Sequence, residues 1–77
     1  KELGAYGITV NCIAPGIVKT DLIADIKEDE LKQITRQIAL NRIGQPQDIA
    51  NVVLFLSSSL SDYISGQIIG VDGCYSM

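Results

Sequence analysis

The pattern of apolar and polar residues divides this 77-residue chain into a strand, two helices and a second strand. Apolar side chains occupy alternate positions in Ile8–Ala14, and the opposite face holds only Thr9 and Asn11 as polar residues. Because neither face is strongly polar, the pattern predicts a parallel strand that is covered on both sides. Pro15 lacks the N–H that a ladder needs and Gly16 permits a sharp turn, so we expect the strand to end there.

Two helices are predicted between the strands. Glu28–Leu40 opens with three acidic residues, which favour a helix N-terminus, and has apolar residues at positions 31, 34 and 38 on one face. Asn41–Gln45 is a connector, after which Pro46 occupies the first position of the second helix and Asp48 lies in its first turn. Arg42 either anchors the connector by bonding to carbonyls or to a carboxylate, or is a plain surface charge.

The second helix is apolar nearly all round, because only Asn51 interrupts the run Ile49–Leu56. Such a helix needs cover on more than one side. The alternative is a core helix buried on one side, with an excess of exposed apolar residues. Ser57–Asp62 is then a loop that leads into a last strand, Gln67–Val71, and Asp72–Gly73 turns the chain out into a tail.

Two segments carry weaker signals. Lys1–Tyr6 is typical of the end of a helix that Gly4 or Gly7 caps, or else of a frayed terminus. Thr20–Lys27 mixes apolar and charged residues without a clean period, which predicts no more than a short, mobile helical turn.

The order strand, helix, helix, strand predicts an α/β unit whose two strands are adjacent and parallel, with a right-handed crossover. In open sheets of this kind, ligands bind beyond the carboxyl ends of the strands. The loop that begins at Pro15 and Gly16 and carries Thr20 is therefore a candidate ligand rim.

Length and composition limit what the chain does alone. A chain this short hides only roughly 60% of its unfolded surface, yet 47% of its residues are hydrophobic. It therefore packs against further sequence or associates with other chains. The net charge of −3, with dispersed basic residues, argues against nucleic acid as a partner.

Other features exclude further classes. No apolar run approaches the ~20 residues that a membrane span needs, and Lys1–Gly4 does not resemble a signal peptide. Cys12 and Cys74 lack metal-ligand spacing and the chain has no histidine, so no metal site is expected. Free thiols in a reducing cytoplasm are favoured over a disulfide, and the predicted location is cytoplasmic.

Four short motifs occur in order along the chain. They are Asn11-x-Ile13-x-Pro15-Gly16-x-Val18-x-Thr20-Asp21, Arg42-x-Gly44-x-Pro46-x-Asp48-Ile49-Ala50, Tyr63-Ile64-Ser65-Gly66-Gln67 and Val71-Asp72-Gly73. Together they resemble the short-chain dehydrogenase/reductase family, and within it the bacterial 3-oxoacyl-(acyl-carrier-protein) reductases. The resemblance implies that residues 1–77 are the C-terminal segment of one Rossmann-like domain, containing the sixth and seventh strands of a doubly wound parallel sheet.

The resemblance also implies an NAD(P)-dependent oxidoreductase that acts on carbonyls or alcohols. The family's catalytic Ser, its Tyr-x-x-x-Lys pair and its glycine-rich dinucleotide turn are absent from this chain, because Tyr6, Tyr63 and Tyr75 all lack a lysine four residues later. No catalytic residue is therefore expected here. NAD or NADP would bind the complete protein, and this chain alone would hold neither firmly.

The cofactor-binding residues that the resemblance implies all lie in one loop. Pro15 and Gly16 shape the turn, the backbone of Val18 meets the nicotinamide carboxamide, and Thr20 bonds near the carboxamide or the pyrophosphate. A purely structural alternative makes Thr20 a helix N-cap. The usual second glycine is replaced by Cys74, which would be strained if that position needs a positive φ.

By the same resemblance, Glu28–Leu40 forms a lid over the substrate; the alternative is a solvated helix without a ligand role. The partners expected are the remainder of the reductase domain and a second copy, through the Ile49–Leu56 helix and the Gln67–Val71 strand. A hypothesis of another class makes the chain a non-catalytic oligomerisation or interaction module.

Overall fold

The chain forms a pair of parallel strands with a helix against it, as seen in a computed structural model that describes residues 3–20 and 25–75. Strand β1 (Cys12–Pro15) pairs with β2 (Ile68–Val71) in parallel, with Cys12 opposite Ile68 and Pro15 opposite Val71. Helices α1 (Glu28–Arg36) and α2 (Pro46–Leu56) lie in the connection. The predicted element order and the adjacent, parallel strands are confirmed.

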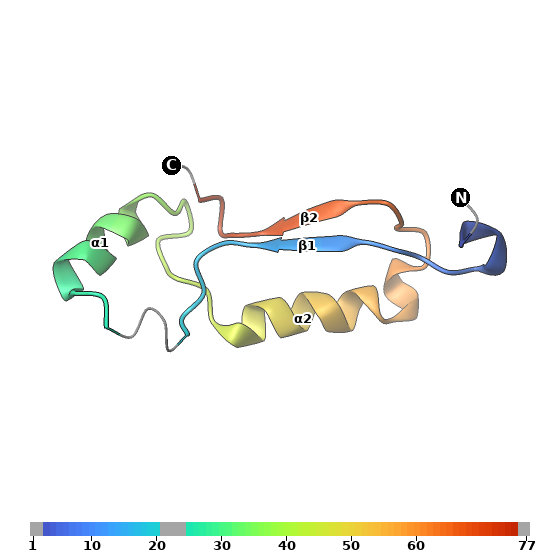
Figure 1. Cartoon of the computed structure of the whole chain (residues 1–77), viewed down its shortest axis with the longest axis horizontal. Helices are drawn as coiled ribbons and strands as arrows, with labels where there is room; N and C mark the ends of the chain where they lie inside the picture. The colour runs from blue at the N-terminus through green and yellow to red at the C-terminus, as the bar shows by residue number, and fades with distance from the viewer. Residues whose placement is uncertain (1–2, 21–24, 76–77) are drawn as a thin grey trace.

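Figure 1 shows how these elements are arranged. Helix α2 runs alongside the strand pair, whereas α1 lies beyond the carboxyl ends of the strands. Pro46 stands at the first position of α2, as predicted. A backbone N–H at that position has no acceptor within the helix, so a proline there costs no hydrogen bond.

The first strand begins later than predicted, at Cys12 rather than near Ile8. The residues before it bond to the turn that leads into β2 instead of to a ladder. The Val10 N–H donates to the Ser65 hydroxyl (3.1 Å), and the Gly66 N–H donates to the Val10 carbonyl (2.7 Å). This turn crosses the end of the strand pair and so shortens the ladder.

Asn11 fixes the start of the pairing. Its Nδ2 donates to the carbonyl of Ile64 (3.2 Å), and its Oδ1 accepts from the N–H of Gln67 (3.0 Å). One side chain thereby satisfies two backbone groups of the turn, and the ladder starts at the next residue, where Cys12 N–H donates to the Gln67 carbonyl (2.8 Å). The second strand accordingly begins at Ile68, one residue later than predicted.

Helix α1 ends at Arg36, so its predicted extension to Leu40 is wrong. The reason is a contact with the C-terminal tail. Ala39 N–H donates to the Cys74 carbonyl (3.2 Å) and Leu40 N–H to the Gly73 carbonyl (3.1 Å). Residues that bond across to another segment in this way cannot continue the i→i−4 ladder of the helix.

Ile38 lies at the centre of this contact. It forms an antiparallel bridge with Tyr75 and is only 2% exposed, which makes it the one buried apolar side chain in the part of the chain that the structure describes. Gly73 has φ +60°, and a Cβ built on it would lie 2.8 Å from Cγ2 of Ile38. The predicted tail after Gly73 is thus tied down at least as far as Tyr75.

The short segments follow local rules. Residues Gly4–Tyr6 form a 3₁₀ turn (η1), and Gly7 ends it at φ 75° with its N–H bonded to the Gly4 carbonyl. Gly7, not Gly4, is the cap. A second 3₁₀ turn (η3), Ser59–Ser61, occupies the predicted loop before β2. The helical turn predicted for Thr20–Lys27 falls largely on positions 21–24, which lie outside the described residues.

The molecule is elongated and poorly covered by its own atoms. Its radius of gyration is 15.5 Å and its longest extent 50 Å, whereas a compact chain of this length has a radius of gyration of about 11–12 Å. Its accessible surface of 6214 Å² exceeds by about 1,600 Å² the roughly 4,600 Å² of a globular protein of this mass. One chain of 77 residues therefore leaves much of its apolar surface uncovered.

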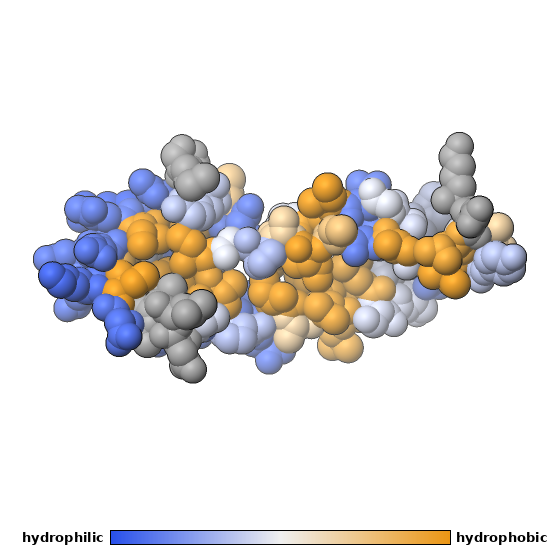
Figure 2. All heavy atoms as spheres, viewed as in Figure 1, coloured by the Kyte–Doolittle hydropathy of each residue, from blue (hydrophilic) through white to orange (hydrophobic). Residues whose placement is uncertain are grey.

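The uncovered apolar residues lie on several elements, and Figure 2 shows one group of them over the strand pair and α2 and another at the end of the molecule that holds α1. On α2 the exposed fractions of the side chains are 48% for Val53, 70% for Leu54 and 40% for Phe55, and on β2 the value for Ile68 is 78%. Helix α2 packs one side toward the strands and leaves the other open, so the predicted cover on a second side stays a prediction.

Candidate functional site at the carboxyl ends of the strands

The carboxyl ends of β1 and β2 lie side by side, where open α/β sheets bind their ligands. Gly16 follows Pro15 directly, and its N–H donates to the Val71 carbonyl (3.1 Å). A Cβ built on Gly16 would lie 2.6 Å from the Cβ of Asp72, which is too close for any side chain. The Pro-Gly sequence therefore ends the strand where two backbones touch.

The loop after Gly16 is held by Gly44 of the connector. Gly44 N–H donates to the carbonyl of Ile17 (2.9 Å), and Lys19 N–H donates to the carbonyl of Gly44 (2.7 Å). These two bonds make a parallel bridge between Val18 and Gly44. A Cβ on Gly44 would lie 3.3 Å from the Ile17 carbonyl oxygen, so glycine also lets the two segments approach.

This bridge determines where the backbone of Val18 points. In extended backbone, successive residues direct their N–H and C=O groups to opposite sides. Because Ile17 and Lys19 face Gly44, the N–H and C=O of Val18 face away from it. Within residues 3–20 and 25–75, neither of these two groups has a hydrogen-bond partner. They form a donor and an acceptor on one residue, which is the pattern that binds a carboxamide.

Thr20 ends the described part of this loop and is exposed. It does not cap α1, whose N-cap residue is Lys27. Its proposed contact with a cofactor stays a prediction, as do those of Pro15, Gly16 and Val18.

Arg42 and Asp48 form an ion pair beside Gly44. The guanidinium donates to both carboxylate oxygens, at 2.8 and 3.0 Å, and Asp48 Oδ2 also accepts from the N–H of Gln45 (2.7 Å). The Arg42 side chain is 56% exposed and that of Asp48 31%. Arg42 also donates to the Ile43 carbonyl (3.5 Å), so the anchoring alternative is the one observed, with bonds to both a carbonyl and a carboxylate.

This pair shifts the pKa of both groups. The hydrogen bond from Arg42, followed by the one from the Gln45 N–H, lowers the pKa of Asp48 from 3.8 to about 2. The hydrogen bond and charge of Asp48 raise the pKa of Arg42. Both groups are therefore charged over the whole neutral range, so neither serves as a general acid or base there.

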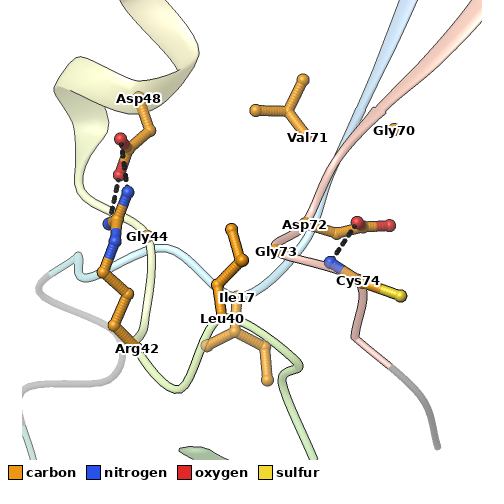
Figure 3. Close-up of a pocket in the computed structure, with 10 residues that line it drawn as sticks. All are labelled: Ile17, Leu40, Arg42, Gly44, Asp48, Gly70, Val71, Asp72, Gly73 and Cys74. Carbon is orange, nitrogen blue, oxygen red and sulfur yellow. Dashed lines mark hydrogen bonds and ion pairs between the residues drawn. The ribbon is translucent and has the colours of Figure 1, made fainter.

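A cavity of about 370 Å³ opens between the connector and the end of β2 (Figure 3). Its lining residues are Ile17, Leu40, Arg42, Gly44, Asp48, Gly70, Val71, Asp72, Gly73 and Cys74. None of the four predicted cofactor contacts lines it. Of the loop and the connector, Ile17 and Gly44 both belong to the lining, whereas Val18 does not.

The chain turns sharply after β2. Asp72 Oδ1 accepts from the N–H of Cys74 (2.9 Å), and Cys74 has φ 63°. The position does need a positive φ, so Cys74 stands where glycine would be unstrained. Both cysteines are free thiols, and among the described residues no group of side chains could hold a metal ion.

Two positioning residues, Asn11 and Gly44, were not among the predicted site residues. Asn11 and Gly44 both belong to motifs quoted above, but their partners cannot be read from local sequence. Asn11 bonds to residues more than fifty positions later, and Gly44 pairs with a loop twenty-six positions earlier.

Comparison with known proteins shows which sequences and structures this chain resembles. A family model described as enoyl-(acyl carrier protein) reductase matches residues 1–76. A 3alpha-hydroxysteroid dehydrogenase of Mediterraneibacter gnavus is 47% identical over 73 residues, and a 3-oxoacyl-[acyl-carrier-protein] reductase of Aquifex aeolicus is 45% identical over the same length. Each alignment covers 95% of this chain and 29% of the relative.

A solved structure agrees with the sequence matches. The crystal structure of a 3-oxoacyl-[acyl-carrier protein] reductase from Brucella melitensis superposes with a TM-score of 0.90 at 36% identity, over 99% of this chain and 28% of that one. This chain thus spans less than a third of the length of the proteins it matches. No helix among the described residues is long and apolar enough to cross a membrane.

The ion pair generates a prediction about acid pH. Because the folded-state pKa of Asp48 is depressed, the stability that the pair contributes is present above about pH 4 and is lost as the pH falls through about 2. A titration of the Asp48 carboxyl carbon by NMR should give a midpoint near pH 2. In Arg42→Gln the midpoint should rise toward the ordinary value.

Arg36→Gln is the matched control, since Arg36 lies in the last turn of α1 and has no bond to Asp48. It should leave the titration unchanged. An Asp48 midpoint that is the same in Arg42→Gln as in the unmodified protein would contradict the assignment of the pKa shift to this pair.

Proposed function

The chain belongs to the short-chain dehydrogenase/reductase family, and from this premise we propose that it forms the nicotinamide side of the active site of an NAD(P)-dependent oxidoreductase. In this proposal residues 1–77 are the C-terminal segment of a Rossmann-like domain. The catalytic Ser, Tyr and Lys belong to the remainder of that domain. The segment acts by binding and orienting the cofactor, and supplies no proton donor of its own.

The observation that supports the proposal best is the backbone of Val18. In the complete protein its N–H would donate to, and its C=O would accept from, the carboxamide of the nicotinamide. Ile17 and Lys19 on either side are bonded to Gly44, so this donor and acceptor are fixed before the cofactor arrives. Preorganised groups of this kind lower the entropic cost of binding and set the orientation of the ring.

Pro15, Gly16 and Thr20 complete the binding loop. Pro15 and Gly16 place the loop at the carboxyl end of β1, and the Thr20 hydroxyl bonds near the carboxamide or the pyrophosphate. NAD(P)H supplies the hydride when it is bound. The role of these loop residues would be to orient the nicotinamide for hydride transfer.

The substrate is a carbonyl or alcohol compound. Names of similar proteins include a hydroxysteroid dehydrogenase and 3-oxoacyl-[acyl-carrier-protein] reductases, which share this chemistry. Reduction of a 3-oxoacyl group on acyl carrier protein is the more specific form of the proposal. Helix α1 lies beyond the carboxyl ends of the strands (Figure 1), which is where a lid over the substrate would have to lie.

The segment alone would hold the cofactor weakly. A few backbone and hydroxyl hydrogen bonds contribute about 1 kcal/mol each, whereas association costs at least about 4 kcal/mol in lost freedom. Most of the affinity is expected from the pyrophosphate on a helix N-terminus in the remainder of the domain.

The open face of α2 supports a second role, which is assembly. Val53 and Leu54 are 48% and 70% exposed, and exposed apolar patches of this kind mark contacts with another chain. We propose that α2 and β2 contact a second copy of the complete protein. The same surface would serve a non-catalytic interaction module, which is the alternative if no cofactor binds.

Substitution at Thr20 tests the binding loop in a complete reductase that contains this segment. Thr20→Val removes the hydroxyl at nearly constant volume and should raise the Kd for NAD(P)H about fivefold. The Kd for adenosine diphosphate ribose, which lacks the nicotinamide, should not change. Thr20→Ser keeps the hydroxyl and serves as the control. Equal losses for both ligands, or no loss for either, would count against the loop as the nicotinamide contact.

A charge on α2 tests the assembly. Leu54→Glu should dissociate the oligomer of the complete protein in sedimentation velocity, because an unpaired carboxylate is costly to bury in an apolar contact. Gln33→Glu, on exposed α1, adds the same charge elsewhere and should leave the oligomer intact. A monomeric unmodified protein at micromolar concentration would refute the proposal.

A further inference from the structure

We infer that Arg42 and Asp48 are a positioning pair for the nicotinamide: they hold Gly44, and Gly44 holds the Val18 backbone in its binding orientation. The inference rests on the proposed function and extends it to two residues that touch no cofactor. It is carried by two sets of hydrogen bonds that the backbone of the connector joins: those of Asp48 with Arg42 and Gln45, and those of Gly44 with Ile17 and Lys19.

The first of these sets is centred on Asp48. It receives the guanidinium of Arg42 at 2.8 and 3.0 Å and the N–H of Gln45 at 2.7 Å. These two partners lie on either side of Gly44 in the chain. Asp48 is fixed in turn by α2, where its own N–H donates to the Gln45 carbonyl (2.8 Å). The connector is therefore closed into a small loop against the helix, with Gly44 within it.

The second set is centred on Gly44. Its N–H and its C=O both bond to the binding loop, to Ile17 at 2.9 Å and to Lys19 at 2.7 Å. A rotation or shift of Gly44 would break at least one of these bonds, because its N–H and C=O face the loop along one edge and bond on either side of Val18. The orientation of the Val18 N–H and C=O depends on both bonds being present.

The exposure of the Arg42–Asp48 pair indicates that it contributes more to the position of the connector than to the stability of the fold. Arg42 is 56% exposed and Asp48 31%, and solvent-exposed ion pairs contribute little to folding free energy. A two-pronged guanidinium–carboxylate contact nevertheless fixes direction as well as distance. Loss of the pair should thus loosen the loop without unfolding the protein.

The test uses a complete reductase that contains this segment, with Arg42→Gln, Asp48→Asn and the double variant. Asp48→Asn removes the charge of the ion pair but retains an oxygen that can accept from the Gln45 N–H. It therefore tests the loss of the ion pair while the hydrogen bond at the start of α2 is kept. Each variant should weaken NAD(P)H binding about fivefold, as expected when one positioned hydrogen bond is lost. The Kd for adenosine diphosphate ribose and the Tm should change little. If the two residues act as one unit, the double variant should resemble either single variant.

Arg42→Lys provides a graded control, because it keeps the charge and loses the two-pronged geometry. An intermediate loss of NAD(P)H affinity is expected. A fall in Tm with no change in the ratio of the two dissociation constants would overturn the inference and leave the pair a structural role only. If Arg42→Gln fails to fold, the ratio measured for Asp48→Asn decides the question by itself.

Thr20→Val, measured in parallel, separates this inference from the proposed function. If Thr20→Val changes the ratio of dissociation constants and the pair variants do not, the positioning role fails alone. If Thr20→Val and the pair variants all leave the ratio unchanged, the loop is not the nicotinamide contact, and both proposals fail.

Discussion

Two backbone hydrogen bonds to Gly44 are the interaction on which the site depends. They connect the loop after β1 to the connector that leads into α2, and they turn the N–H and C=O of Val18 away from Gly44. The contacts around them serve the same geometry. Gly16 brings the end of β1 against Asp72, and Asp48 closes the connector that carries Gly44. A small set of backbone contacts thereby makes a rigid donor and acceptor without any buried charge.

The sequence predicted those elements whose ends are determined by the conformational preference of a single residue. Pro46 starts α2 because its ring suits a first helical position, and Gly7 ends the first turn because it adopts a positive φ. Long-range pairing set the rest. The end of α1 at Arg36 follows from bonds to the C-terminal tail, and the late start of β1 follows from Asn11 bonding to a turn over fifty residues away. Periodicity carries no information on such partners, so the role of Gly44 required the structure.

The exposed surface of this segment is what supports its proposed place in a larger assembly. An excess of about 1,600 Å² over a compact chain of equal mass is comparable to the total area buried in a typical protein interface. Only Ile38 is buried among the apolar residues that the structure describes. In the proposed complete reductase, the remainder of the domain and a second copy at α2 would supply most of the hydrophobic stabilisation that this segment lacks.

The amide of Val18 tests the account most directly. In a ¹⁵N-labelled complete reductase that contains this segment, addition of NAD(P)H should move the Val18 amide proton downfield, as expected for a new hydrogen bond to the carboxamide. Adenosine diphosphate ribose should leave that resonance in place, and the Gly44 amide, already bonded to Ile17, should respond little to either ligand. A Val18 amide that does not respond to NAD(P)H, or that responds equally to both ligands, would contradict the assignment of this loop to the nicotinamide.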